Sequence, residues 1–204
     1  RNVRAENLSA SMITALLDRN PKVDPNEVED VIWGCVQQTL EQAFNVARFA
    51  QLLTPIPKQV GAQTVNRLCG SGIQAIVSGS HMILAGEARA CLVGGMENMT
   101  QAPHIVRGAR KGLRLGNAKL DDLLWESLMD PYCGFYMAQT SNNLARDYGI
   151  TREEQDAFAV SSQDKAVAAM AAGRLGEEIV AVTVGEGKRA VTVTQDEHPR
   201  PGTT

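Results

Sequence analysis

The sequence predicts a strand over residues 63–66, then a helix, and then a further strand over residues 89–94, and this order constrains the fold more than any other feature. The helix, predicted over residues 71–85, has large aliphatic side chains on most of its sides, with small residues between them. A helix that is apolar on most sides is expected in a core rather than at a surface. Buried strands that alternate with helices favour a layered α/β architecture, with sheets on both sides of this central helix.

The rest of the chain extends this pattern. Helices are predicted around residues 8–16 and 46–53, and a buried strand is predicted over residues 31–36. In the second half, Thr151 and Glu154 have the spacing of a capping box, and the Ala-rich helix after them is predicted to end near Gly173. Residues 179–184 and 190–194 are predicted to form a β-hairpin. Because residues 104–135 are charged and weakly periodic, we expect two domains, residues 1–103 and 104–204.

Composition gives no support for several classes of function. The net charge of −3 and the isoelectric point of about 5.7 do not favour nucleic-acid binding. No apolar run reaches the roughly 18–20 residues that span a bilayer, so no membrane partner is expected. The four cysteines form no CxxC pair and no metal-binding spacing with histidine, which predicts no metal site and a reducing, cytoplasmic location.

Cys69 is the candidate nucleophile from its context. It lies between a predicted strand and the Gly70-Ser71-Gly72 start of the central helix. At a helix N-terminus, free N–H groups and the positive end of the helix dipole favour the thiolate, which is the form that attacks acyl carbons and thioesters. The alternative is that Cys69 is buried and acts as a small hydrophobic residue, as free cysteines commonly do.

The sequence gives weaker indications of function for the other three cysteines and for a cluster of basic residues. Cys35 and Cys91 lie within apolar strands and are expected in the core. Cys133 lies in a turn, and its sequence context leaves its role open. The basic cluster consists of Arg107, Arg110, Lys111 and Arg114. It is expected to lie in a solvated loop, and the alternative is that it contacts an anionic ligand or a partner chain.

Five stretches, in order, resemble the thiolase family, and specifically the 3-ketoacyl-CoA thiolases (acetyl-CoA C-acyltransferases). They are WGCVQQTLEQ (33–42), TVNRLCGSG (64–72), GGMENM (94–99), REEQDAFA (152–159) and DEHPRP (196–201). The resemblance covers essentially the whole chain. It implies the layered α/β/α/β/α thiolase fold, of which this chain would supply the N-terminal α/β domain and part of the loop domain.

The resemblance also implies an activity in fatty-acid β-oxidation. Cys69 matches the family's nucleophile, which attacks the 3-keto carbon of a 3-ketoacyl-CoA and keeps the acyl group as a thioester until a second CoA accepts it. The backbone N–H of Cys69 would be one donor of the oxyanion hole. Met137 matches a residue that packs on the pantetheine arm of CoA, with an ordinary core methionine as the alternative. No cofactor is implied, because coenzyme A is a substrate.

The implied partners are acyl-CoA, CoA and further copies of the chain. Thiolases are dimers or tetramers, with the strand before the nucleophile near the dimer contact. Residues 107–121, called the arm below, match the loop that many members use to form a homotetramer. Some degradative members also bind a hydratase–dehydrogenase subunit.

The chain departs from the family in two respects. The family's second half carries a Gly-His-Pro histidine, an Asn-Glu-Ala-Phe segment and a Cys-x-Gly cysteine, and these 204 residues contain none of them; His198 belongs to the connecting segment. We therefore expect an N-terminal part, inactive alone. Tyr136 replaces a histidine that is usual in biosynthetic members, which favours the degradative class. The alternatives are a biosynthetic acetoacetyl-CoA thiolase, a ketoacyl synthase and a non-catalytic scaffold of the same fold.

Overall fold

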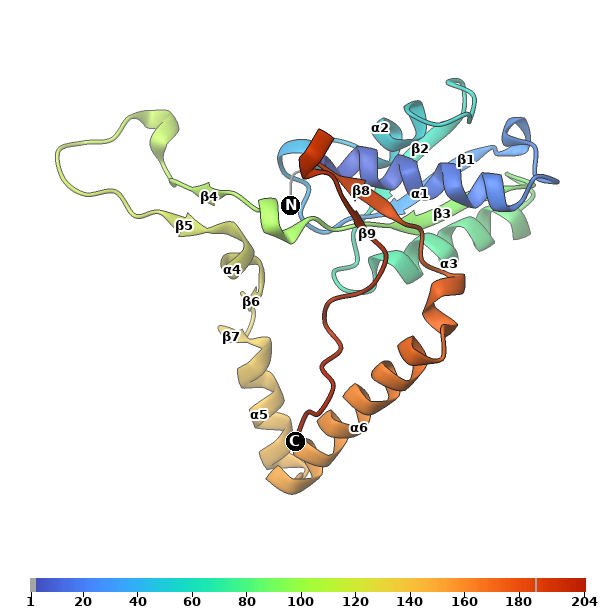
Figure 1. Ribbon diagram of the computed structural model, residues 1–204. Helices are drawn as coiled ribbons and strands as arrows, with labels where there is room; N and C mark the ends of the chain where they lie inside the picture. Colours follow the sequence, from blue (N-terminus) through green and yellow to red (C-terminus); the bar gives the residue numbers. More distant parts are fainter. Residues whose placement is uncertain (1–2, 186) are drawn as a thin grey trace. The chain divides into compact units, whose positions relative to one another are not determined.

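The computed structural model describes residues 3–185 and 187–204 (Figure 1). The chain divides into two compact units, Arg1–Ile105 and Val106–Thr204. The division falls between residues 105 and 106, where the sequence suggested residues 103 and 104. The two units are described separately below.

The first unit is built on a three-stranded parallel sheet. Its strands are β1 (Asp30–Gly34), β2 (Gly61–Val65) and β3 (Cys91–Gly95), in the order β2-β1-β3. Trp33 of β1 lies opposite Thr64 on one side and Gly94 on the other. The three strands predicted from the sequence are thus confirmed, with their ends displaced by one or two residues.

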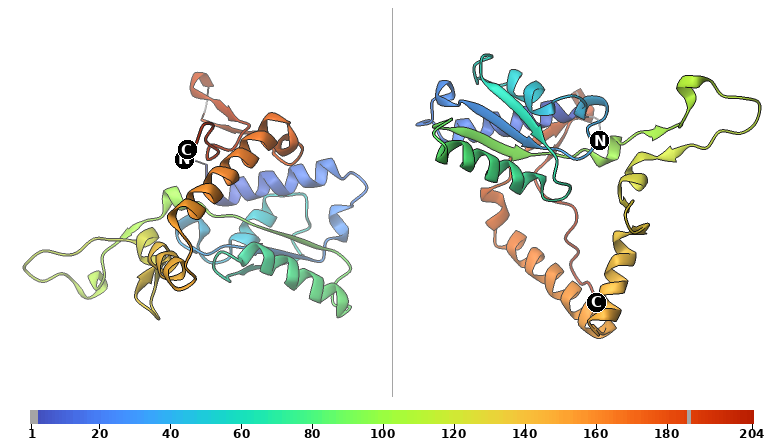
Figure 2. Two further views of the ribbon diagram at one scale, coloured as in Figure 1. Left: turned by 90° about the horizontal axis from the view of Figure 1, so that it is seen from below. Right: turned by 180° about the vertical axis from the view of Figure 1, so that it is seen from behind.

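Helices cover both faces of this sheet (Figures 1 and 2). Helices α1 (Ala5–Arg19) and α2 (Val46–Leu52) pack on one face, and α3 (Ser71–Leu84) packs on the other. Alternate residues of β1 lie on the two faces, because Val31 and Trp33 join the core with α1 and α2, whereas Ile32 faces α3. Cys35, directly after the strand, joins the same core as Val31 and Trp33. Short 3₁₀ turns complete the unit at Pro25–Glu27, Leu40–Gln42 and Met99–Gln101, and β4 (His104–Ile105) ends it.

The expectation that α3 is buried on most sides is wrong for the residues described. Its small residues Ser71, Ala75 and Gly79 are buried against the sheet. The large side chains on the rest of the helix are exposed, namely Ile73, Ile76, Ile83 and Leu84. Small side chains allow a close approach, so the sheet covers only the narrow face that they form. Apolar residues all around a helix favour its burial on every side. In the described part of the chain, only one face of α3 is packed against apolar neighbours.

The second unit consists of short strands and two longer helices. It begins with a 3₁₀ turn (Ala109–Lys111), β5 (Asp121–Asp122) and α4 (Leu123–Ser127), followed by the antiparallel pair β6 (Met129–Asp130) and β7 (Phe135–Tyr136). Helices α5 (Met137–Asp147) and α6 (Arg152–Ala171) come next, and then a 3₁₀ turn (Arg174–Glu177). The antiparallel hairpin of β8 (Val182–Val184) and β9 (Val191–Val193) surrounds a last 3₁₀ turn (Gly187–Arg189).

Local signals in the second unit are confirmed. The Thr151 hydroxyl accepts the N–H of Glu154 and the Glu154 carboxylate accepts the N–H of Thr151, which is the reciprocal capping box. Gly173 has a φ of +73° just beyond the end of α6, as its predicted capping role requires. Within the described parts of both units, no helix has the length and apolarity needed to cross a bilayer.

Candidate active site

Three loops meet at one edge of the first unit's sheet. Because β1, β2 and β3 are parallel, their carboxyl ends lie together, and they continue into residues 35–38, 66–70 and 96–98. Sheet-like bonds extend into these loops, since Cys35 N–H donates to the Val65 carbonyl at 3.1 Å and Met96 N–H donates to the Gly34 carbonyl at 3.0 Å. This edge is the usual place for ligand binding in open α/β sheets.

Cys69 lies exposed in the turn between β2 and α3. Gly70 is the N-cap and Ser71 the first helical residue, so the cysteine precedes the helix by two residues. The preceding residue, Leu68, has a φ of +49°, a left-handed conformation that side chains larger than glycine rarely adopt. We call residues 66–71 the cysteine turn.

The Ser71 hydroxyl closes the cysteine turn on itself. It donates to the carbonyl of Leu68 at 2.6 Å and accepts the N–H of Arg67 at 2.9 Å. Backbone bonds from Gly70 N–H to the Arg67 carbonyl (3.1 Å) and from Ser71 N–H to the Leu68 carbonyl (3.0 Å) complete it. The turn therefore places an accessible thiol beside the amino end of α3.

Asn66 connects this turn to the loop after β1, and Glu97 connects that loop to the end of β3; sequence reasoning did not single out either residue. Asn66 Oδ1 accepts the N–H of Leu68 at 2.9 Å, and its Nδ2 donates to the carbonyl of Val36 at 3.2 Å. Glu97 Oε2 accepts the N–H of Val36 at 2.8 Å, and Oε1 accepts that of Gln37 at 3.1 Å. An Asn two residues before a left-handed residue is a recognisable turn signal, whereas nothing near Glu97 in the sequence indicates its contacts.

The other cysteines differ from Cys69 in environment. Cys35 is buried as predicted, and burial together with the nearby Glu97 carboxylate raises the pKa of its thiol to about 12. Cys91 is only partly buried, which corrects the core assignment, because it begins the edge strand β3. Burial, Asp30 and Glu29 raise the pKa of its thiol. Cys133 is exposed in its turn.

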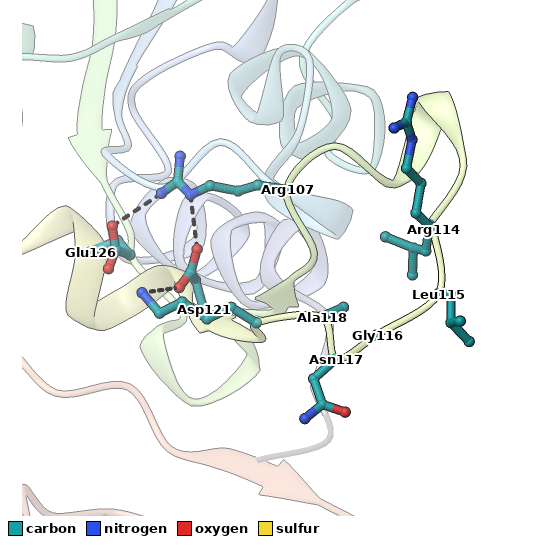
Figure 3. Close-up of a pocket in the computed structure, with 10 residues that line it drawn as sticks. Arg107, Arg114, Leu115, Gly116, Asn117, Ala118, Asp121 and Glu126 are labelled. Carbon is teal, nitrogen blue, oxygen red and sulfur yellow. Dashed lines mark hydrogen bonds and ion pairs between the residues drawn. The ribbon is translucent and has the colours of Figure 1, made fainter.

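The arm carries its own charged cluster in the second unit. Arg107 lies between two carboxylates, with Nε 2.8 Å from Asp121 Oδ2 and a terminal nitrogen 3.0 Å from Glu126 Oε2 (Figure 3). Lys119 Nζ is 2.6 Å from Asp121 Oδ1. Lys119 and then Arg107 hold the pKa of Asp121 below its usual value. The cluster borders an open hollow of about 520 Å³, and Arg114 lies on the far side of the loop (Figure 3).

Comparison with known proteins assigns the family. The model of the thiolase N-terminal domain matches residues 1–204. The chain belongs to the thiolase family. This thiolase-family chain is 47% identical over 207 residues to the 3-ketoacyl-CoA thiolase of Shewanella oneidensis, and 44% identical to that of Aliivibrio fischeri. All of this chain is covered in both comparisons, and it spans about half the length (50%) of the Shewanella protein.

Solved structures confirm the thiolase fold. The human mitochondrial 3-ketoacyl-CoA thiolase in complex with CoA is 43% identical, with a TM-score of 0.92. The acetyl-CoA acetyltransferase of Bacillus anthracis is 36% identical, with a TM-score of 0.93. Both cover the whole of this chain, which in turn covers 50% and 51% of those chains.

In the thiolase chain, Met137 opens α5 and is 64% exposed, so it is not the core methionine of the alternative interpretation. Tyr136 precedes it, and its ring centroid lies 4.3 Å from that of Trp125. The Tyr136 N–H donates to Gln139 Oε1 at 3.0 Å, which caps the start of α5. The helix start thus presents the Met137 side chain to solvent. Its contact with CoA stays a prediction.

Proposed function

We propose that the protein containing this chain is a 3-ketoacyl-CoA thiolase, which cleaves a 3-ketoacyl-CoA with CoA to give acetyl-CoA and a shortened acyl-CoA. The observation that carries the proposal is the exposed thiol of Cys69, placed before α3 at the carboxyl edge of a parallel sheet. The 47% identity to a protein named 3-ketoacyl-CoA thiolase supports the same reaction.

The chemistry of Cys69 follows in two steps. Its thiolate attacks the 3-keto carbon, the bond between C2 and C3 breaks, and the electron pair of that bond leaves with acetyl-CoA, which takes up a proton at C2. The acyl group now forms a thioester with Cys69 Sγ. In the second step the sulfur of CoA, having lost its proton, attacks this thioester and releases acyl-CoA and the Cys69 thiolate. We assign the stabilisation of the developing oxyanion in part to the backbone N–H of Cys69.

Degradation is favoured over synthesis by two observations. Tyr136 stands where a histidine is usual in biosynthetic members, and identity is higher to the 3-ketoacyl-CoA thiolases (43–47%) than to the Bacillus acetyl-CoA acetyltransferase (36%). The second candidate is nevertheless acetoacetyl-CoA synthesis from two acetyl-CoA, because the Bacillus enzyme has an equally similar fold. Both reactions form an acyl-Cys69 intermediate.

Intact-mass spectrometry of the full-length protein that contains this chain, incubated with acetyl-CoA or acetoacetyl-CoA, tests the proposal. We expect a gain of one acetyl group, mapped by peptide analysis to Cys69 and absent in Cys69→Ala. Cys133→Ala is the matched control, because Cys133 is the other exposed cysteine, and it should leave the adduct unchanged. An adduct on another residue, or none while Cys69 remains open to alkylation, would contradict a nucleophilic role in this protein.

We also propose the setting in which the protein works. Four free thiols support a reducing cytosol, where the reaction would serve fatty-acid β-oxidation. Met137 would contact the pantetheine arm of CoA. The arm exposes Leu113, Leu115 and Leu120, which supports its use in joining copies of the chain into a homotetramer rather than a dimer. A hydratase–dehydrogenase subunit is a further candidate partner.

A further inference from the structure

We propose that Glu97 and Asn66 are positioning residues for Cys69, which act in series through the backbone of residues 36 and 37. The inference rests on the proposed function, because it gives these side chains a task in the reaction of Cys69. They are assigned no contact with the substrate. Their effect is exerted on the conformation of the cysteine turn.

Glu97 makes the first link, at the carboxyl end of β3. Its carboxylate is partly buried and receives two successive backbone N–H groups, at 2.8 Å from Val36 and 3.1 Å from Gln37. The Cys35 thiol lies 3.8 Å from Oε1 and is a third donor. Hydrogen bonds to a carboxylate are stronger than those between neutral groups. The loop after β1 is therefore held in one conformation by a residue 60 positions away in the chain.

Asn66 makes the second link. The carbonyl of Val36, held in place by Glu97, accepts a hydrogen bond from Asn66 Nδ2 at 3.2 Å. This bond orients the amide so that Oδ1 accepts the N–H of Leu68 at 2.9 Å. Leu68 adopts a left-handed conformation that persists only where surrounding contacts stabilise it. The series thus runs from the end of β3, across the end of β1, to the residue directly before Cys69.

This geometry determines where Cys69 presents its two functional groups. The thiol and the backbone N–H belong to one residue, and the φ and ψ angles of Leu68 set the direction of both relative to α3. An error of about 1 Å in the placement of reacting groups can lower a rate on the order of a hundredfold. Loss of either link is therefore expected to affect the turnover of bound substrate more than the intrinsic reactivity of an exposed thiol.

The test uses the full-length protein in a thiolysis assay. Glu97→Gln removes the charge and one of the two acceptor oxygens. Asn66→Ala removes both hydrogen bonds of the second link, to Val36 and from Leu68. Asn66→Asp keeps the acceptor for Leu68 but loses the donor to Val36. Asn45→Ala is the matched control, because Asn45 similarly donates to a backbone carbonyl (Ala62, 2.8 Å) and accepts a backbone N–H (Arg48, 3.2 Å). It also accepts the Thr64 hydroxyl at 2.8 Å, and none of these three partners belongs to the cysteine turn.

We expect each of Glu97→Gln, Asn66→Ala and Asn66→Asp to lower kcat about tenfold or more, with KM for CoA and the rate of Cys69 alkylation by iodoacetamide within about twofold of the parent. Because the two links act in series, the double variant Glu97→Gln/Asn66→Ala should lose no more kcat than the single variant with the larger loss. Asn45→Ala should cost a similar number of degrees in Tm but leave kcat unchanged.

Three results would overturn the proposal. The first is a fall in kcat that matches Asn45→Ala or simply follows the loss of folded protein. The second is full activity in Asn66→Asp, and the third is additive losses in the double variant. Failure of the proposed function itself is distinguished by Cys69→Ala: if that variant retains thiolysis, Cys69 is not the nucleophile, whatever the other variants do.

Discussion

At the scale of single residues, the same side chain acquires different chemistry from its surroundings. Cys69 and Cys133 are exposed, whereas Cys35 is buried 3.8 Å from the Glu97 carboxylate. Burial and that negative charge both disfavour the Cys35 thiolate, which is why its pKa rises to about 12. The exposed thiol of Cys69 and the buried thiol of Cys35 thus lie on adjacent loops of the same sheet edge.

Alkylation should separate these thiols. At pH 8 the Cys35 thiol stays protonated, because its pKa of about 12 lies far above that pH. We expect iodoacetamide to label Cys69 and Cys133 in the native protein and to leave Cys35 unmodified, as measured by peptide mass spectrometry over time. Denatured protein, in which all four cysteines should react, is the control. Labelling of native Cys35 as fast as Cys133 would show that burial and the Glu97 carboxylate do not protect it.

At the scale of elements, the cysteine turn depends on how closely α3 approaches β1. Gly34 provides this approach, because a Cβ atom there would lie 2.7 Å from the backbone carbon of Ser71. Backbone cannot move aside as the end of a flexible side chain can. By contrast, a Cβ at Gly72, within the first turn of α3, would meet nothing within 4 Å.

These two glycines should respond in opposite ways to substitution by alanine. We expect Gly34→Ala to lower the free energy of unfolding by about 1–3 kcal/mol, because it pushes the start of α3 off the sheet. Gly72→Ala should raise it by about 0.5–1 kcal/mol, since alanine favours the helix and no contact opposes it. Urea denaturation of both variants measures the difference. Equal effects of the same sign would mean that the close approach does not limit packing.

At the scale of the whole molecule, the two units have different kinds of stability. The first unit has a buried apolar core between α1, α2 and the sheet, whereas no described residue of α6 is buried. The base of the arm is instead held by charge, through Asp121 with Lys119 and Arg107. Ion pairs of this kind depend on pH, so the arm should lose this stabilisation in acid.

The sign of this dependence follows from the lowered pKa of Asp121, which is caused first by Lys119 and then by Arg107. The ionised carboxylate stabilises the folded arm, so its contribution is present above the unfolded-state pKa of about 3.9 and is lost as pH falls through the lower folded value. We expect amide protection in residues 107–121, corrected for intrinsic exchange, to fall over this range. Asp121→Asn should show low protection already at pH 7, and unchanged protection in that variant would contradict the argument.

Much of the fold was predictable because it depends on local signals. Strand positions followed from apolar runs, the start of α6 from Thr151 and Glu154, and its end from Gly173. The candidate nucleophile also followed from local order, since a strand, a cysteine and small helical residues occur in sequence. Asn66 could have been found from its turn pattern, but the bonds of Glu97 join residues about 60 positions apart and leave no local trace.

The sequence by itself determined the helices and strands from α1 to β3, helix α6, the β8–β9 hairpin, the family, and the place of Cys69 before α3, because periodicity, capping and motif spacing act between near neighbours in the chain. It did not indicate β4 to β7, α4 or α5. Only the tertiary structure decided that the pKa of the buried Cys35 thiol rises to about 12 beside Glu97, that Cys91 lies at a half-buried edge, and that α3 buries its small face while its large side chains remain exposed. The physical reason is that burial and electrostatic environment are set by which distant segments come together.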